Sequence, residues 1–196
     1  MRNETRAREI AIAADSPLQF RIVARGPRRG PDLTASHTVI GIALIRITFG
    51  AIWAVDAILK WQPAFRANFG RIVAGVGDGQ PSFLGWWFRL WQIVVAGDRA
   101  PMFALLTATT ETYLACAVIA GFARRITYTI GFAYGLFVWS VAEGFGGPYV
   151  PGTSTDVGAA IIYSLVFLAL LLVDAGRFSV DRLIVRRVPA WRRISD

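Results

Sequence analysis

The sequence predicts an all-α integral membrane protein: a four-helix bundle with an additional interfacial amphipathic helix between helices one and two. Its 196 residues are 55% hydrophobic and 13% aromatic but only 17% charged, whereas about a quarter of the residues in soluble domains are charged. Four segments approach the roughly 20 apolar residues that a helix needs to cross the hydrocarbon core of a bilayer. The basic residues that produce the net charge of +8 lie mainly outside these segments.

The four apolar segments define the predicted spanning helices, at about 37–59, 101–123, 126–143 and 157–173. Pro101 suits the first turn of the second helix, where its missing N–H costs nothing. Arg124 and Arg125 leave room only for a tight turn. The second and third helices are therefore expected to form an antiparallel hairpin.

The segment SFLGWWFRLWQIVV, residues 82–95, predicts the amphipathic helix. Its apolar side chains recur at helical spacing on one stripe: Phe83, Trp87, Leu90, Trp91 and Val94. At about 14 residues the segment is too short to span a bilayer, so we expect it to lie on the membrane surface. A half-buried helix packed on the bundle is the alternative.

The distribution of basic residues predicts the topology. Residues 1–36 form a basic cytoplasmic tail without a signal-peptide apolar region, residues 37–175 form the transmembrane domain, and residues 176–196 form a second basic cytoplasmic tail. With both termini inside, fifteen Lys and Arg lie on the cytoplasmic side and five outside. The positive-inside rule therefore predicts a multi-pass protein of the cytoplasmic membrane, N-in and C-in. Membrane lipid is the expected partner, and no nucleic-acid-binding motif accompanies the charge.

The scarcity of metal-ligating side chains excludes several chemistries. Cys116 is the only cysteine and His37 the only histidine. One cysteine cannot form an internal disulfide, a CxxC pair or a thiolate metal site, and one histidine cannot supply paired imidazoles to haem or copper. We expect no intrinsic metal, haem or disulfide, so any redox cofactor must be borrowed.

Two ionisable residues fall near the predicted membrane midplane, where an unpaired charge costs at least about 2.5 kcal/mol. Arg46 lies nine residues into the first helix, and Glu111 lies ten residues into the second. Because these helices run antiparallel, Arg46 and Glu111 are predicted to form a buried ion pair. The pair is either a structural lock or the charged floor of a polar cavity.

Three carboxylates are predicted to meet at the outer rim of the bundle: Asp56, Glu143 and Asp156. Trp53 shares a helical face with Asp56, and Trp139 shares one with Glu143. An aromatic wall ending in a carboxylate suits a small organic ring with a polar head, such as a quinone. Ordinary anchoring at the membrane interface is the alternative.

The predicted site is completed by the loop EGFGGPYVPGTSTDVG, residues 143–158. Its glycines allow close backbone approach and its prolines stiffen the path, as expected of a fixed lid. We predict that Glu143 and Asp56 handle protons as catalytic residues. Trp53, Trp139, Asp156 and Thr155 are predicted to bind quinone or substrate.

This loop, followed by AAIIYSLVFLALLL, resembles the DoxX-like family of four-helix membrane proteins. RITFGAIWAVDAILKWQPAF resembles the family's first helix, and the resemblance covers about residues 37–175. Within the family it is closest to the DoxD small subunits of thiosulfate:quinone oxidoreductase. The resemblance implies a membrane subunit that, with a partner redox subunit of DoxA or another type, oxidises a sulfur compound outside the membrane and reduces quinone.

Two other functions fit the sequence. The chain could be a non-catalytic membrane anchor or assembly factor for a partner redox enzyme, since its amphipathic helix and basic tails suit that role. It could also be a small transporter, for which Arg46 and Glu111 are the support. As a transporter, a chain of only four helices would form a homo-oligomer to enclose a path for its substrate.

Overall fold

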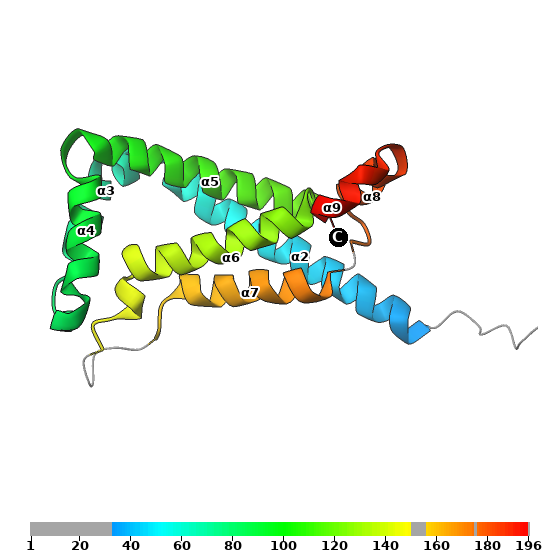
Figure 1. The fold of residues 1–196 in the computed structure, drawn as a ribbon, viewed down its shortest axis with the longest axis horizontal. Helices are drawn as coiled ribbons and strands as arrows, with labels where there is room; N and C mark the ends of the chain where they lie inside the picture. Colours follow the sequence, from blue (N-terminus) through cyan, green and yellow to red (C-terminus); the bar gives the residue numbers. More distant parts are fainter. Residues whose placement is uncertain (1–32, 150–155, 175, 196) are drawn as a thin grey trace, which may run out of the picture. The chain divides into compact units, whose positions relative to one another are not determined.

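The computed structural model describes residues 33–149, 156–174 and 176–195, and within them every regular element is helical. Residues 1–32 of the predicted N-terminal tail lie outside the described part of the chain, and so does the predicted site residue Thr155. Figure 1 shows the arrangement of the helices.

All four predicted apolar segments are helical, with ends within a few residues of those expected. The corresponding helices are α2 (Leu33–Lys60), α5 (Ala100–Ala120), α6 (Arg124–Val141) and α7 (Ala159–Val173). Among the described residues, two helical stretches are long and apolar enough to cross a membrane, namely His37–Lys60 and Gly97–Ala120, and α7 is a shorter apolar helix.

The segment between α2 and α5 holds two helices, of which only the second was predicted. They are α3 (Pro63–Gly75) and α4 (Gly85–Val95), with the short turns η1 (Ser82–Leu84) and η2 (Gly97–Arg99). α4 packs on α3, and its Trp91 ring lies 4.7 Å from that of Phe137 in α6. Phe88 and Val95 are buried, whereas Phe83 and Trp86 are exposed. One face of α4 is therefore packed on the bundle, as the alternative prediction had it. Other apolar side chains of this segment remain exposed.

The helices pack mainly in two pairs, α2 with α5 and α6 with α7. Gly131 and Gly135 of α6 lie against Phe167 and Ser164 of α7, so closely that a Cβ at either glycine would overlap them. This G-x-x-x-G spacing is typical of helices whose backbones approach closely. α5 and α6 are joined by a tight turn but contact each other less than either contacts its main partner. The predicted tight turn between these helices is thus confirmed, but α5 packs mainly on α2 and α6 packs mainly on α7.

An aromatic cluster joins the two pairs. Phe49 and Trp53 of α2 meet Phe167 of α7 edge to face, with ring centroids 5.0 and 5.1 Å apart respectively. Leu114 and Tyr128 are buried in the same cluster. Each such aromatic pair contributes roughly 0.5–1.5 kcal/mol beyond its buried area.

The C-terminal segment, predicted to be a basic tail, is folded. It forms α8 (Val180–Arg187), η4 (Pro189–Trp191) and α9 (Arg192–Ser195), and α9 packs on α6. Asp181 and Ser195 are buried. In Figure 1, α8 and α9 lie at the opposite end of α5 from α3 and α4.

Candidate functional site

A cavity of about 140 Å³, here called the polar cavity, lies among α2, α5, α6 and the start of α7. Trp53, Asp56 and Lys60 reach it from one face of α2, because residues three, four and seven apart share a helical face. Its lining residues are Trp53, Asp56, Lys60, Glu111, Tyr134, Gly135, Val138, Glu143, Ala159, Ala160 and Tyr163.

The polar cavity brings together part of the predicted rim site. Trp53, Asp56 and Glu143 all line it. Trp139 is not among the lining residues. Its indole N–H donates to the Val157 carbonyl oxygen at 2.7 Å instead. Asp156 accepts a hydrogen bond from the Gly158 N–H at 2.8 Å and is also outside the lining.

The predicted ion pair between Arg46 and Glu111 is wrong. Arg46 pairs with Asp174, with Nη1 and Oδ2 3.2 Å apart, and donates from Nη2 to the Phe178 carbonyl oxygen at 2.6 Å. Glu111 instead lies 3.5 Å from Lys60 Nζ and accepts from the Tyr134 hydroxyl at 3.0 Å.

The antiparallel register of α2 and α5 explains this error. Gly50 packs against Ile119, and Trp61 donates to the Thr112 hydroxyl at 2.9 Å. This register places Arg46 beside Gly121, at the turn after α5, and Glu111 beside the end of α2. Depth counted from the helix starts cannot reveal such an offset, because side-chain packing sets the register.

Lys60 is the cation of the polar cavity, and it was not among the predicted site residues because it directly follows the predicted helix 37–59. Its Nζ lies 3.0 Å from Asp56 Oδ1 and 3.5 Å from Glu111 Oε2. Side-chain exposure falls along this series, from 35% for Asp56 through 21% for Lys60 to 3% for Glu111. The three charges therefore form a graded path from the surface into the protein.

Two polar atoms at the polar cavity lack a hydrogen-bond partner within the described chain. They are the indole N–H of Trp53 and Oε2 of Glu111, and both are buried. A buried polar group without a hydrogen bond costs about 1–3 kcal/mol, a cost that the ion pair with Lys60 at 3.5 Å reduces for Glu111. A ligand that accepted from Trp53 and donated to Glu111 would offset that cost.

Glu143 has a structural role in addition to lining the cavity. Its Oε2 accepts from the Ala160 N–H at 3.0 Å, so the carboxylate satisfies a free donor at the N-terminus of α7. Gly158 makes this contact feasible, because it has a φ of 86° and a Cβ there would overlap the Glu143 carboxylate.

A second cavity of about 90 Å³, here called the apolar chamber, adjoins the first. The two share Lys60, Glu111, Tyr134 and Val138. The rest of its wall is mostly aromatic and aliphatic and comes from α3, α4, α5 and α6: Phe65, Phe69, Ile72, Val73, Trp91, Val95, Phe103, Thr107, Phe137, Val141 and Ala142. A polar space thus opens beside an apolar one at Glu111.

Another cluster of buried charge, here called the C-terminal charge network, comprises Arg46, Arg124, Tyr128, Asp174 and Asp181. Asp174 Oδ2 accepts from the Tyr128 hydroxyl at 2.6 Å in addition to pairing with Arg46. Asp181 pairs with Arg124 at 3.3 Å. The network ties α2, α6, the end of α7 and α8 together.

Asp181 is the most fully bonded carboxylate of this network. Its Oδ1 accepts from the Ala123 N–H at 2.7 Å and from the Trp191 indole at 2.8 Å. Its Oδ2 accepts from the backbone N–H of Arg124 at 2.9 Å. Asp181 therefore caps the N-terminus of α6 from a distant part of the chain, a role that local sequence spacing does not reveal.

Among the described residues no group of three or more His, Cys, Asp and Glu side chains is placed to hold a metal ion. Comparison with protein-family models, curated proteins and solved structures finds no match for this chain. The described residues by themselves define a helical fold with two helices long and apolar enough to cross a membrane, and with a polar cavity beside an apolar chamber.

Proposed function

We propose that this chain is the membrane subunit of a quinone-linked oxidoreductase of the thiosulfate:quinone type. The observation that carries the proposal is the polar cavity opening beside the apolar chamber at Lys60, Glu111 and Tyr134. A quinone likewise has a polar part beside an apolar part, since its ring carries two carbonyl groups and its isoprenoid tail is apolar.

The exposure of apolar side chains supports a membrane location. In the most apolar windows of His37–Lys60 and Gly97–Ala120, only 28% and 39% of the residues are buried inside the protein. Core helices of soluble proteins bury such residues, and exposed apolar surface of this extent indicates contact with lipid or a partner. Leu44, Ile45 and Ile58 are examples on α2.

In the proposed topology α2, α5, α6 and α7 cross the cytoplasmic membrane as a four-helix bundle. The exposed Phe83 and Trp86 would place α4 at the interface. Both termini lie in the cytoplasm, in accord with the distribution of basic residues. The polar cavity then faces the outer side, and the C-terminal charge network faces the cytoplasm.

The residues at the cavities fit a quinone. The partnerless indole N–H of Trp53 would donate to a carbonyl oxygen of the ring, and Lys60 offers a second donor nearby. The phenylalanines of the apolar chamber would hold the first part of the tail. Tyr163 lies 5.1 Å from the Trp53 ring and adds aromatic surface to the polar cavity wall.

When bound, a quinone accepts two electrons and two protons, and a sulfur anion such as thiosulfate is the proposed electron source through a partner redox subunit. Glu111 is the proposed proton donor, because its Oε1 is held by Tyr134, whereas its Oε2 has only the 3.5 Å contact with Lys60 Nζ and no hydrogen bond. Asp56 and Lys60 would return the proton from the surface along the graded path. Glu143 would hold the start of α7 in place.

The proposal is tested by purifying the native complex in mild detergent and extracting its bound quinone. We expect quinone to remain with the wild type. In Glu111→Gln, thiosulfate-dependent quinone reduction should fall about a hundredfold, because general acid–base groups contribute rate factors of this order. The amide retains the hydrogen bond to Tyr134, and Lys60 keeps Asp56 as its closer partner at 3.0 Å, so the thermal unfolding midpoint should change little.

Asp98→Asn is the matched control, since it removes one exposed carboxylate that lines neither cavity. It should leave both quinone content and turnover unchanged. A complex with full activity in Glu111→Gln and no quinone on this chain would overturn the proposal and favour a membrane anchor. Substrate flux into liposomes containing the chain alone would favour a transporter.

A further inference from the structure

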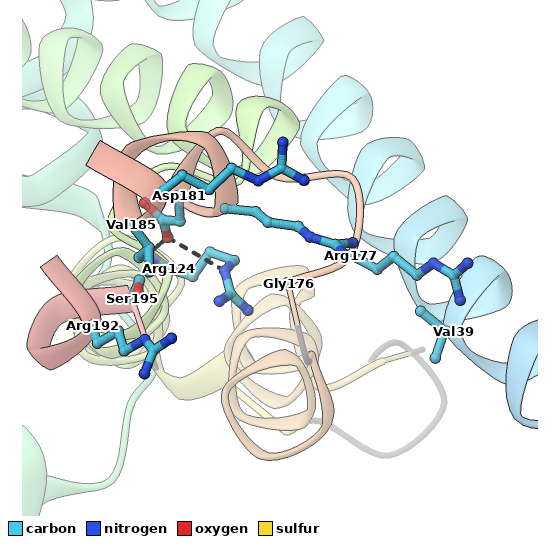
Figure 2. Close-up of a pocket in the computed structure, with 10 residues that line it drawn as sticks. Val39, Arg124, Gly176, Arg177, Asp181, Val185, Arg192 and Ser195 are labelled. Carbon is cyan, nitrogen blue, oxygen red and sulfur yellow. Dashed lines mark hydrogen bonds and ion pairs between the residues drawn. The ribbon is translucent and has the colours of Figure 1, made fainter. Parts of the chain in front are cut away.

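We propose that a cavity at the C-terminal end of the fold binds a phosphate group. This arginine cavity, of about 540 Å³, is lined by residues of α2, α6, α8 and α9 and of the turn before α8. Its lining residues are Val39, Arg124, Gly176, Arg177, Asp181, Arg182, Val185, Arg186, Arg192 and Ser195. Figure 2 shows Arg124, Arg177 and Arg192 around the space.

The charge of the arginine cavity is strongly unbalanced. Five arginines line it against the single carboxylate of Asp181. Asp181 already pairs with Arg124 and accepts hydrogen bonds from the Ala123 N–H and the Trp191 indole. Its charge is therefore engaged within the fold, and the other arginines outnumber the carboxylates that the described residues place at the cavity.

Four of these arginines form no ion pair with a carboxylate in the described part of the chain: Arg177, Arg182, Arg186 and Arg192. Like charges gathered around one space repel one another, so the arrangement is stabilised when an anion enters.

The fold brings these guanidinium groups together from separate elements. Arg182 and Arg186 are four residues apart on α8 and share its face, while Arg177 precedes α8 and Arg192 begins α9. The buried pair of Arg124 with Asp181 fixes α8 against α6 beneath them. The site is therefore held by the C-terminal charge network, not by a flexible tail.

Arginine suits phosphate because its planar guanidinium offers paired N–H donors that match two phosphate oxygens. The surroundings favour the phosphate of a membrane lipid. Phe178, Leu183 and Val188 are exposed apolar residues of the same segment, as expected of a short amphipathic helix lying at the headgroup level. This choice of source depends on the proposed membrane location, but it does not depend on quinone binding.

The test compares two double variants of the full chain that remove the same charge. Arg182→Gln/Arg186→Gln changes two cavity residues, and Arg187→Gln/Arg193→Gln changes two exposed neighbours outside the lining. None of the four forms an internal ion pair in the described chain, so both variants should fold.

Binding is measured by native mass spectrometry of protein in detergent, with dioleoylphosphatidylglycerol, dioleoylphosphatidylcholine or inorganic phosphate added separately. We expect the wild type to retain phosphatidylglycerol in preference to phosphatidylcholine. The cavity variant should bind it about tenfold or more weakly, because each charge-assisted hydrogen bond is worth more than a neutral one. The neighbour variant should lose less than about threefold, the effect of general surface charge.

Each outcome decides the proposal. Loss of phosphatidylglycerol in the cavity variant alone supports a lipid phosphate site. Binding of inorganic phosphate alone, with the same dependence on Arg182 and Arg186, supports the site with a soluble source. Equal losses in both variants, equal retention of the two lipids, or no binding of either probe overturns it.

Discussion

The polar cavity and the C-terminal charge network both bury charge between helices, yet they differ in how completely their polar atoms are satisfied. At Asp181 both carboxylate oxygens accept hydrogen bonds, and four donors converge on them. At the polar cavity, the Trp53 N–H has no hydrogen-bond partner within the described chain, and Glu111 Oε2 has only the ion pair with Lys60 Nζ at 3.5 Å. Saturated networks rigidify a fold, whereas partly satisfied ones indicate a place for a ligand.

The contrast has one exception, because Nε of Arg46 is also buried without a hydrogen-bond partner. Its two terminal nitrogens, however, bond to Asp174 and to the Phe178 carbonyl oxygen. Arg46 itself lines none of the described cavities, although its partner Asp174 lines a space of about 390 Å³. The incomplete atoms at Trp53 and Glu111 differ because they line cavities.

The largest expected effect is on stability at the C-terminal network. Asp181→Ala removes the acceptor of four buried hydrogen bonds, two of them from Arg124, whose other carboxylate neighbour, Asp174, lies farther away at 3.9 Å. Breaking a buried ion pair in this way should lower the free energy of unfolding by about 3–5 kcal/mol. Chemical unfolding in detergent, followed by circular dichroism, measures it. Asp98→Ala should cost less than about 0.5 kcal/mol, and equal losses in the two variants would contradict a structural network.

The next effect concerns the wall of the polar cavity. Gly135→Val should lower the free energy of unfolding by about 1–3 kcal/mol, because overpacking forces neighbouring atoms apart. The added side chain would meet Ser164 and the Ala160 backbone. Gly41→Val is the control, since a Cβ at Gly41 meets nothing within 4 Å. Detergent unfolding curves of equal midpoint for the two variants would rule out the close approach of α6 to α7.

A smaller effect distinguishes ligand binding from stability. Trp53→Phe removes an N–H that has no hydrogen-bond partner in the described chain, and the smaller ring leaves a void in the buried aromatic cluster, so the free energy of unfolding should fall by about 1–2 kcal/mol. Quinone affinity should fall about three- to tenfold, the value of one hydrogen bond. Equilibrium titration with a short-chain quinone measures it.

Trp139→Phe is the matched control for this change. It loses the hydrogen bond to the Val157 carbonyl oxygen, so it should cost stability and leave quinone affinity unchanged. The reverse pattern, with affinity reduced only in Trp139→Phe, would move the ligand from the polar cavity to the outer loop.

The smallest effect is expected at the exposed end of the graded path. Asp56→Asn breaks a partly exposed pair with Lys60 at 3.0 Å, and such pairs contribute about 0.2–1 kcal/mol. The loss should shrink further at high salt, because salt screens exposed charges. Unfolding curves at low and high ionic strength measure it, and a loss as large as that of Asp181→Ala would place Asp56 in a saturated network instead.

Parts of the site could be predicted from local spacing, and other parts could not. Trp53 and Asp56 were predicted to share a face because residues three apart on a helix do so, and both line the polar cavity. Lys60 lies on the same face and was missed only because the predicted helix ended one residue earlier. The role of Tyr134 could not be predicted from the residues next to it in sequence, since its hydrogen-bond partner Glu111 is on another helix.

The sequence by itself determined the helical segments, the contrast between apolar helices and basic ends, and the faces on which local residues gather. These follow from helix periodicity and residue type, which act over a few neighbouring positions. Only the tertiary structure decided that Arg46 pairs with Asp174, that Lys60 pairs with Glu111, and that Asp181 caps α6. These contacts depend on the register and pairing of helices, which the packing of side chains such as Gly50 against Ile119 determines across long stretches of chain.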